Sequence, residues 1–145
     1  MQTTITIHHV AFGLCSTCYG KRTLTAPGAV SDIAKLREDT YAATNAPFEF
    51  MTGAQSDLIS GQTLEGKCYS MSVGDLIEVT DDEGHHSLAI VASFGFKTLA
   101  SADVNGGVAP LLAGILKEWD DDPTGRGYFD LVASKHEVPA ALVGK

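Results

Sequence analysis

The sequence predicts a single α+β domain over residues 1–145, with an antiparallel or mixed sheet of about four to five strands and two helices packed on one face. Two patterns support this class: β-branched residues alternate with other residues in strand-like segments, and two further segments repeat their apolar residues at helical spacing. In addition, hydrophobic residues make up 44% of the chain and charged residues 19%, which is typical of a globular protein and excludes a disordered one.

The first half of the chain is expected to contain one strand and one helix. Isoleucines alternate with threonines in residues 3–12, which predicts a strand. Residues 13–28 contain three glycines and are expected to form a loop. Ser31 is suited to cap a helix over residues 31–41. Residues 48–68 are compatible either with a short strand or with one to two helical turns.

The second half begins with the clearest pattern, a β-hairpin over residues 75–97. Two apolar segments flank an acidic turn that ends in Gly84. A helix is expected over residues 108–119, where leucine, isoleucine and tryptophan recur at helical spacing before an aspartate run and a proline. A last strand is expected over residues 127–133 because aromatic and aliphatic residues gather there.

Acidic residues dominate the charge of the chain. Eighteen Asp and Glu residues outnumber ten Lys and Arg residues, and the formal net charge of −8 argues against direct binding to nucleic-acid phosphates. The excess lies beyond residue 60, where six basic residues accompany thirteen acidic residues. Two clusters stand out: Asp81, Asp82 and Glu83 in the hairpin turn, and Glu118, Asp120, Asp121 and Asp122 after the second helix.

These two clusters predict one electronegative patch that binds a host protein with a basic surface, because complementary charge speeds encounter and imposes specificity. Two other interpretations remain open. The acidic residues can serve solubility and the termination of the turn and the helix. The segment from Asp120 to Gly125 also matches the first half of a calcium-binding EF-hand loop, although Leu131 stands where that loop carries a glutamate.

The three cysteines suggest a second kind of site. Cys15 and Cys18 form a CxxC motif, which supplies half of a tetrahedral zinc site. Cys68 or a histidine such as His85 would have to complete it, and reduced cysteines that pack as small apolar residues are the alternative. The odd number of cysteines and the lack of a secretory signal pattern lead us to expect reduced thiols in the cytoplasm.

The hairpin region resembles a known family. The residues that carry the resemblance are Ser72, Val73 and Asp75, followed by Ser93, Phe94, Gly95 and Phe96. They are similar to the two halves of the hairpin motif of the YodL-like domain, mainly over residues 70–97, although Ala92 stands where that family has an acidic residue. The resemblance implies a small protein of bacteria or their mobile elements, often phage- or conjugation-associated, with no established catalytic activity.

The same motif residues are expected to act as scaffold. Asp75 is placed to pin the preceding turn through its carboxylate. Gly95 stands between Phe94 and Phe96, so that the two aromatic rings share one strand face and the glycine permits a bulge.

Taken with the charge, these patterns predict a non-catalytic, cytosolic binding protein encoded by a phage or mobile element. It would inhibit a host factor, such as a defence complex in the manner of anti-restriction or anti-CRISPR proteins, through its acidic surface. The alternative is a zinc-binding or thiol-dependent enzyme domain that uses the CxxC motif and the histidines. No segment carries a catalytic signature, and no apolar run approaches the roughly 20 residues of a membrane span, so we expect no catalytic residues, no cofactor other than zinc and no membrane contact.

Overall fold

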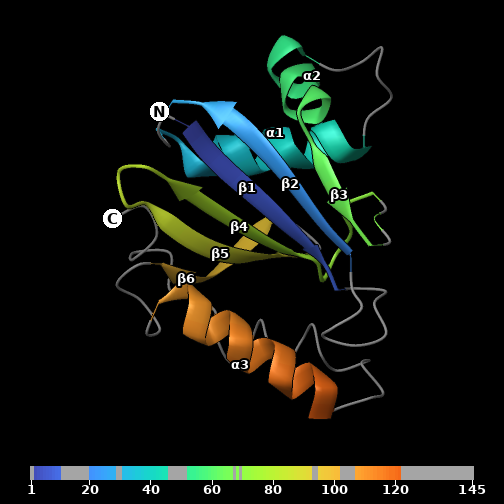
Figure 1. The fold of residues 1–145 in the computed structure, drawn as a ribbon, viewed down its shortest axis with the longest axis vertical. Coiled ribbons are helices and arrows are strands. Elements are labelled where there is room, and N and C mark those ends of the chain that lie inside the picture. The colour runs from blue at the N-terminus through green and yellow to red at the C-terminus, as the bar shows by residue number, and fades with distance from the viewer. Residues whose placement is uncertain are drawn as a thin grey trace.

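The computed structural model describes residues 2–10, 20–28, 31–45, 52–66, 68, 70–92, 95–101 and 107–121. In these residues, six strands form one antiparallel sheet in the order β3-β2-β1-β4-β5-β6 (Figure 1). The strands are β1 (Gln2–His9), β2 (Gly20–Pro27), β3 (Thr63–Glu65), β4 (Leu76–Asp81), β5 (His86–Val91) and β6 (Phe96–Ser101). The helices are α1 (Ile33–Asn45), α2 (Gly53–Ser60) and α3 (Val108–Asp121). The predicted α+β class is confirmed, with six strands in place of four or five.

The sheet is built around β1, which pairs with β2 on one side and with β4 on the other. Ile5 and Ile7 are fully buried because residues two apart face the same side of a strand. Leu24 lies opposite Ile5 and Ile77 lies opposite Ile7, so apolar side chains line up across three strands. The alternation that predicts the first strand therefore marks the centre of the sheet, although β1 ends at His9 rather than at residue 12.

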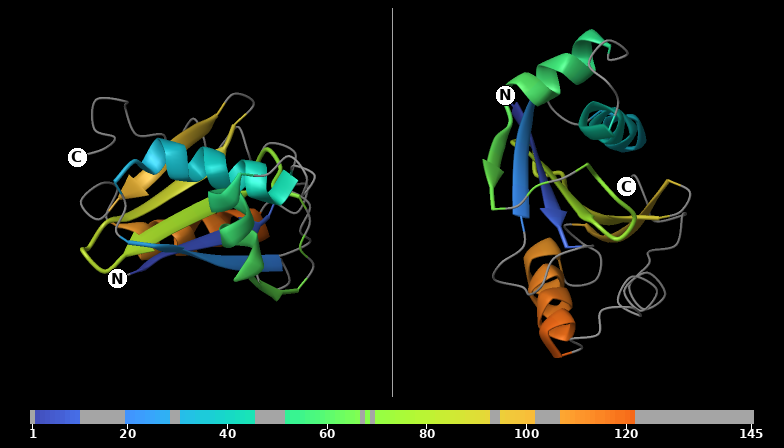
Figure 2. Two further views of the ribbon diagram at one scale, coloured as in Figure 1. Left: turned by 90° about the horizontal axis from the view of Figure 1, so that it is seen from above. Right: turned by 90° about the vertical axis from the view of Figure 1, so that its right-hand side faces the viewer.

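Helices cover both faces of the sheet. In the right-hand view of Figure 2, α1 and α2 lie above the sheet and α3 lies below it. Helices α1 and α2 pack on the face that carries Ile77 and Val79, whereas α3 packs on the face that carries Leu88 and Ile90. The expected placement of the helices on one face is thus corrected. Strands β4 and β5 carry apolar side chains on both faces, and each face needs its own cover to exclude water.

The segment expected to form a loop, residues 13–28, contains strand β2. Its buried positions alternate as a strand requires, but one of them is Arg22 rather than an apolar residue. The Arg22 Nη1 group donates a hydrogen bond to Gln62 Oε1 at 3.1 Å, so the guanidinium is accommodated inside the fold. The buried arginine concealed the period-two pattern in the sequence. Residues 11–19 lie outside the described ranges.

The hairpin pattern corresponds to three strands rather than two. Strand β5 ends at Val91, and the chain then turns, with Ala92 N donating to Gly95 O at 2.9 Å. Gly95 has a φ of +72°, which lies in the left-handed region that favours glycine. Strand β6 then pairs antiparallel with β5, so this turn divides the second apolar segment of the predicted hairpin into two strands.

The helix starts follow local capping rules. Helix α1 is capped by Asp32 rather than Ser31, because Asp32 Oδ1 accepts a hydrogen bond from Lys35 N at 3.0 Å. Part of the segment that the sequence left open forms α2, which begins with a capping box between Thr52 and Gln55.

Helix α3 continues to Asp121, so the first aspartates after residue 119 belong to the helix rather than ending it. The expected strand over residues 127–133 lies outside the described residues. None of the helices in the described part of the chain combines the length and the apolar composition that crossing a membrane requires.

Candidate functional site

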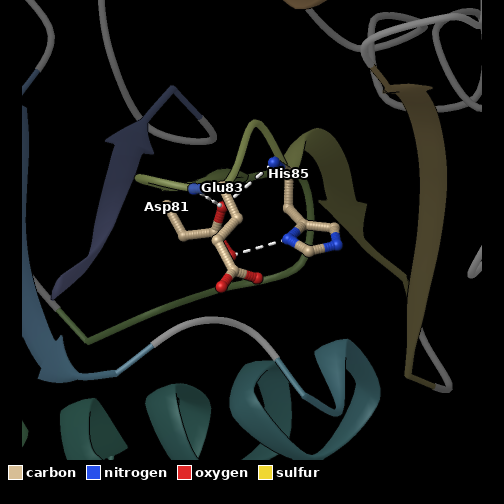
Figure 3. A group of neighbouring side chains, drawn as sticks. All are labelled: Asp81, Glu83 and His85. Atoms are coloured by element: carbon tan, nitrogen blue, oxygen red, sulfur yellow. Dashed lines mark hydrogen bonds and ion pairs between the residues drawn. The ribbon is translucent and has the colours of Figure 1, made fainter. Parts of the chain in front are cut away.

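The acidic turn, defined as residues 81–85, joins β4 to β5 and contains the first cluster of predicted binding residues. Asp81 is only 6% exposed, and its carboxylate lies inside the turn (Figure 3). Its Oδ1 atom accepts hydrogen bonds from the backbone N–H groups of Glu83 and His85 at 2.9 and 3.0 Å. The His85 imidazole donates from Nδ1 to Asp81 Oδ2 at 2.7 Å. Asp81 therefore shapes the turn instead of presenting its charge to a partner.

Asp82 and Glu83 are the carboxylates that the acidic turn exposes to solvent. Asp82 Oδ2 accepts a hydrogen bond from Gln2 N at 3.2 Å, which ties the turn to the start of β1. Gly84 completes the reversal with a φ of +90°. The two exposed charges thus stand on a turn that hydrogen bonds hold from within and from the neighbouring strand.

The second acidic cluster lies at the C-terminal end of α3. Glu118 is half-buried, Asp120 and Asp121 belong to the last turn of the helix, and Asp122 lies outside the described residues. In Figure 1, the acidic turn lies at the left edge of the molecule, whereas α3 runs to the lower right and ends there. Within the described residues, the end of α3 therefore lies away from the acidic turn, and no single patch of the kind that the sequence led us to expect joins them.

Glu78 in β4 joins two histidines from the neighbouring strands. Its Oε1 atom accepts a hydrogen bond from His8 Nε2 at 3.1 Å, and its Oε2 atom accepts one from His86 Nε2 at 2.8 Å. Both imidazoles act as donors here because an ionised carboxylate can only accept. The bond from His8, aided by the bond from His86 and opposed by burial, lowers the pKa of Glu78 to about 2. Glu78 therefore keeps its charge except at strongly acidic pH.

These three residues belong to a polar face of the sheet. Figure 1 shows the front of β1 and β2 without a helix across it, while α1 lies behind them. The outward positions of β1 alternate with the buried isoleucines and include Thr4 and Thr6. Thr4 is paired with Thr25 of β2 and Thr80 of β4, so hydroxyl groups form a row across three strands. The threonines are visible in the sequence, but their alignment depends on the order of the strands.

A further histidine–carboxylate pair is fully buried. His9 Nδ1 lies 3.3 Å from Asp75 Oδ2, and both side chains are inaccessible to solvent. The same Oδ2 atom accepts a hydrogen bond from Ser72 N at 3.0 Å. Asp75 therefore pins the preceding turn, as the motif predicted, and the histidine supplies it with a buried partner.

The second half of the motif is described in part. Ser93 and Phe94 lie outside the described residues. Gly95 forms the turn before β6, and the Phe96 ring contacts Tyr41 of α1 edge to face, with ring centroids 6.4 Å apart. Phe96 thus packs between the sheet and α1, which agrees with a scaffold role.

Of the candidate metal ligands, the structure describes Cys68 and His85. Cys15 and Cys18 lie outside the described residues, and the half-buried Cys68 donates from its thiol to Lys21 O at 3.3 Å. Within the described ranges, one group of three ligand side chains has its donor atoms within 4.8 Å of one another: Asp81, Glu83 and His85. His85 is therefore placed with the carboxylates of the acidic turn, and both oxygens of Asp81 already accept hydrogen bonds there.

One depression lined wholly by described residues lies between the start of α1 and the strands β1 and β2. Its volume is about 180 Å³, and its lining includes Thr3, Lys35 and Asp39. Small-molecule sites usually start at about 300 Å³. This depression is therefore smaller than a typical small-molecule site.

No protein-family model, curated protein or solved structure matches this chain. Function is therefore inferred from the residues and the geometry described above.

Proposed function

We propose that this protein binds another protein through the exposed carboxylates of its acidic turn, Asp82 and Glu83. The observation that carries the proposal is the inward carboxylate of Asp81, which forms three hydrogen bonds within the turn. Because the turn is held in this way, its two exposed charges need little further ordering when a partner binds. A partner of complementary chemistry has a basic surface.

The net charge of the chain supports the same proposal. A formal charge of −8 attracts cationic surfaces over several ångströms and raises the rate of encounter at low salt. The α3 end contributes to this long-range field, although it lies away from the acidic turn. Binding at the turn itself determines which orientation of the partner is accepted.

The class of partner is proposed from the resemblance of residues 70–97 to YodL-like domains. Such domains occur in mobile elements, and a basic host protein, such as a component of a defence complex, is the target that we propose for an acidic protein of this kind. The chain would act in the cytoplasm by occupying the basic surface and thereby inhibiting the host factor.

Charge reversal at the acidic turn tests this function. The double variant Asp82→Lys, Glu83→Lys is compared with Glu38→Lys, Asp57→Lys, which makes the same change in net charge at two exposed helical positions. Each protein serves as bait in a bacterial lysate at about 0.1 M and about 1 M salt, because salt screens charge pairs of this kind. Loss of a salt-sensitive partner from the turn variant alone supports the proposal. Equal capture by both variants would refute it.

A second candidate function is cation binding at the same turn, because the ligand atoms of Asp81, Glu83 and His85 lie within 4.8 Å of one another. Carboxylate and imidazole groups together suit a divalent transition metal. Calorimetric titration of the wild type and of His85→Ala with Zn²⁺ distinguishes the two functions. Saturable binding that His85→Ala abolishes supports the metal site, whereas partner capture that withstands a chelator supports protein binding without a metal.

A further inference from the structure

Arg37 is a buried cation on the helix that covers the sheet. It lies in α1 and is 4% exposed, with its side chain directed at β5 and β6. Figure 2 shows α1 lying across this face of the sheet. Most arginine side chains keep their charged end in water, so a guanidinium in this position requires an explanation.

The contacts of Arg37 are made with neutral groups. Its Nη1 atom donates to Thr98 Oγ1 at 3.1 Å and its Nη2 atom donates to Ser87 Oγ at 3.3 Å. Its Nε atom is buried and has no hydrogen-bond partner. Among the ion pairs of the described residues, none includes Arg37.

The guanidinium nevertheless keeps its charge. Burial lowers the pKa of Arg37 to about 10, which is still well above neutral pH. A buried charge is normally compensated by an opposite charge, because hydroxyl dipoles replace only part of the lost hydration. Arg37 therefore has the donors and the charge for an anion that the protein does not itself supply within the described residues.

We propose that Arg37, Ser87 and Thr98 form a binding site for an oxyanion, namely the carboxylate or phosphate group of a small molecule. The Nε atom and the adjacent Nη atom of a guanidinium form a planar fork that matches two oxygens of such a group. Each hydroxyl can accept from Arg37 and donate its own proton to the anion. The proposal goes beyond the acidic turn and does not depend on its function.

The surroundings limit the ligand. Ser87 is half-buried, whereas Arg37 itself is enclosed. The anion-bearing group must therefore be small. Because the chain carries a formal charge of −8, a singly charged carboxylate approaches at lower electrostatic cost than a doubly charged phosphate.

The test uses formate and inorganic phosphate as probes, with chloride at equal ionic strength as the reference. Thermal unfolding of the full chain is followed at increasing anion concentration, because a ligand that binds only the folded state raises the midpoint, and the rise continues with the logarithm of ligand concentration above the Kd. Calorimetry supplies the stoichiometry. We expect one oxyanion per chain, and a midpoint that rises with formate or phosphate beyond the effect of chloride.

The variants locate the effect. Arg37→Met keeps the length of the side chain without its charge, and it should weaken the response about tenfold or more, since it removes charge-assisted hydrogen bonds. Lys35→Met is the matched control, because Lys35 is an exposed cation on the same helix and should leave the response unchanged. Ser87→Ala retains the guanidinium, is better tolerated at a half-buried position, and should weaken the response if Arg37→Met does not fold.

Each result is decisive. A response to formate alone identifies a carboxylate site, a response to phosphate alone identifies a phosphate site, and a response to both identifies a general oxyanion site. The proposal is overturned if the wild type responds to neither probe beyond chloride. It is also overturned if Arg37→Met, or Ser87→Ala in its place, retains the full response.

Discussion

Replacing Glu78 by glutamine should destabilise the protein at neutral pH and have little effect at strongly acidic pH. The carboxylate accepts hydrogen bonds from two histidines, and its pKa falls from 4.5 to about 2. A depression of that size corresponds to about 3 kcal/mol of folding free energy. Because the Glu78 side chain is 23% exposed and solvent screens it in part, we expect about 1 to 2 kcal/mol.

The direction of the pH dependence follows from the lowered pKa. A carboxyl group that is more acidic in the folded state contributes its stability above the unfolded-state pKa, and this contribution is lost as the pH falls through the folded-state pKa. The wild type should therefore lose the Glu78 contribution between about pH 5 and about pH 2. Glu78→Gln lacks the titrating group and should not show this component.

Urea unfolding followed by circular dichroism at about pH 7 and about pH 2 measures the difference between the two proteins. At neutral pH the thermal midpoint of the variant should fall by roughly 3 °C per kcal/mol. Glu38→Gln provides the control, because Glu38 is exposed on α1 and should be nearly neutral at both pH values. A destabilisation by Glu78→Gln that stays the same at both pH values, or that is absent at neutral pH, would show that the two histidine contacts do not stabilise the carboxylate.

Three further changes probe the acidic turn, the core and the β5–β6 turn. Asp81→Ala removes three hydrogen bonds and should cost about 1 to 3 kcal/mol, with faster amide exchange at Glu83 and His85 measured by NMR. Ile115→Ala leaves a cavity beneath α3 and should cost about 2 to 5 kcal/mol in urea unfolding; a cost below about 1 kcal/mol would contradict the packing of α3 on the sheet. Gly95→Ala should cost about 1 to 2 kcal/mol through its φ of +72° alone, since no atom beyond the two adjacent residues lies within 4 Å of the added methyl group. An unchanged thermal midpoint for Gly95→Ala would exclude that backbone conformation.

The acidic turn was predictable because its signals are local. Strong apolar alternation on both sides and a terminal Gly84 specify where the chain reverses. The inward orientation of Asp81 was not predictable from three adjacent acidic residues, since each of them is a candidate for solvent exposure. Asp81 turns inward because the backbone N–H groups of Glu83 and His85 both donate to its Oδ1 atom, and these groups come together only once the turn has formed.

The stabilising role of Glu78 was missed for a different reason. In the sequence it is one polar position in a strand, and such residues normally face water. His8 is 70 positions away along the chain, and the two side chains meet because β1 pairs with β4 in a particular register. The adjacent histidines at positions 8–9 and 85–86 were the one available signal, and they do not identify the carboxylate between the strands.

By itself, the sequence determined the α+β class, the first strand, the acidic turn and two of the helical segments, because these depend on periodicity and turn residues within short stretches of chain. Only the tertiary structure decided that α3 covers the face opposite α1, that the end of α3 lies away from the acidic turn, and that Arg37 meets Ser87 and Thr98. Strand order, register and the face of the sheet that each helix covers depend on contacts between segments that are distant in the sequence. The free energy of such contacts cannot be read from a pattern within one short segment.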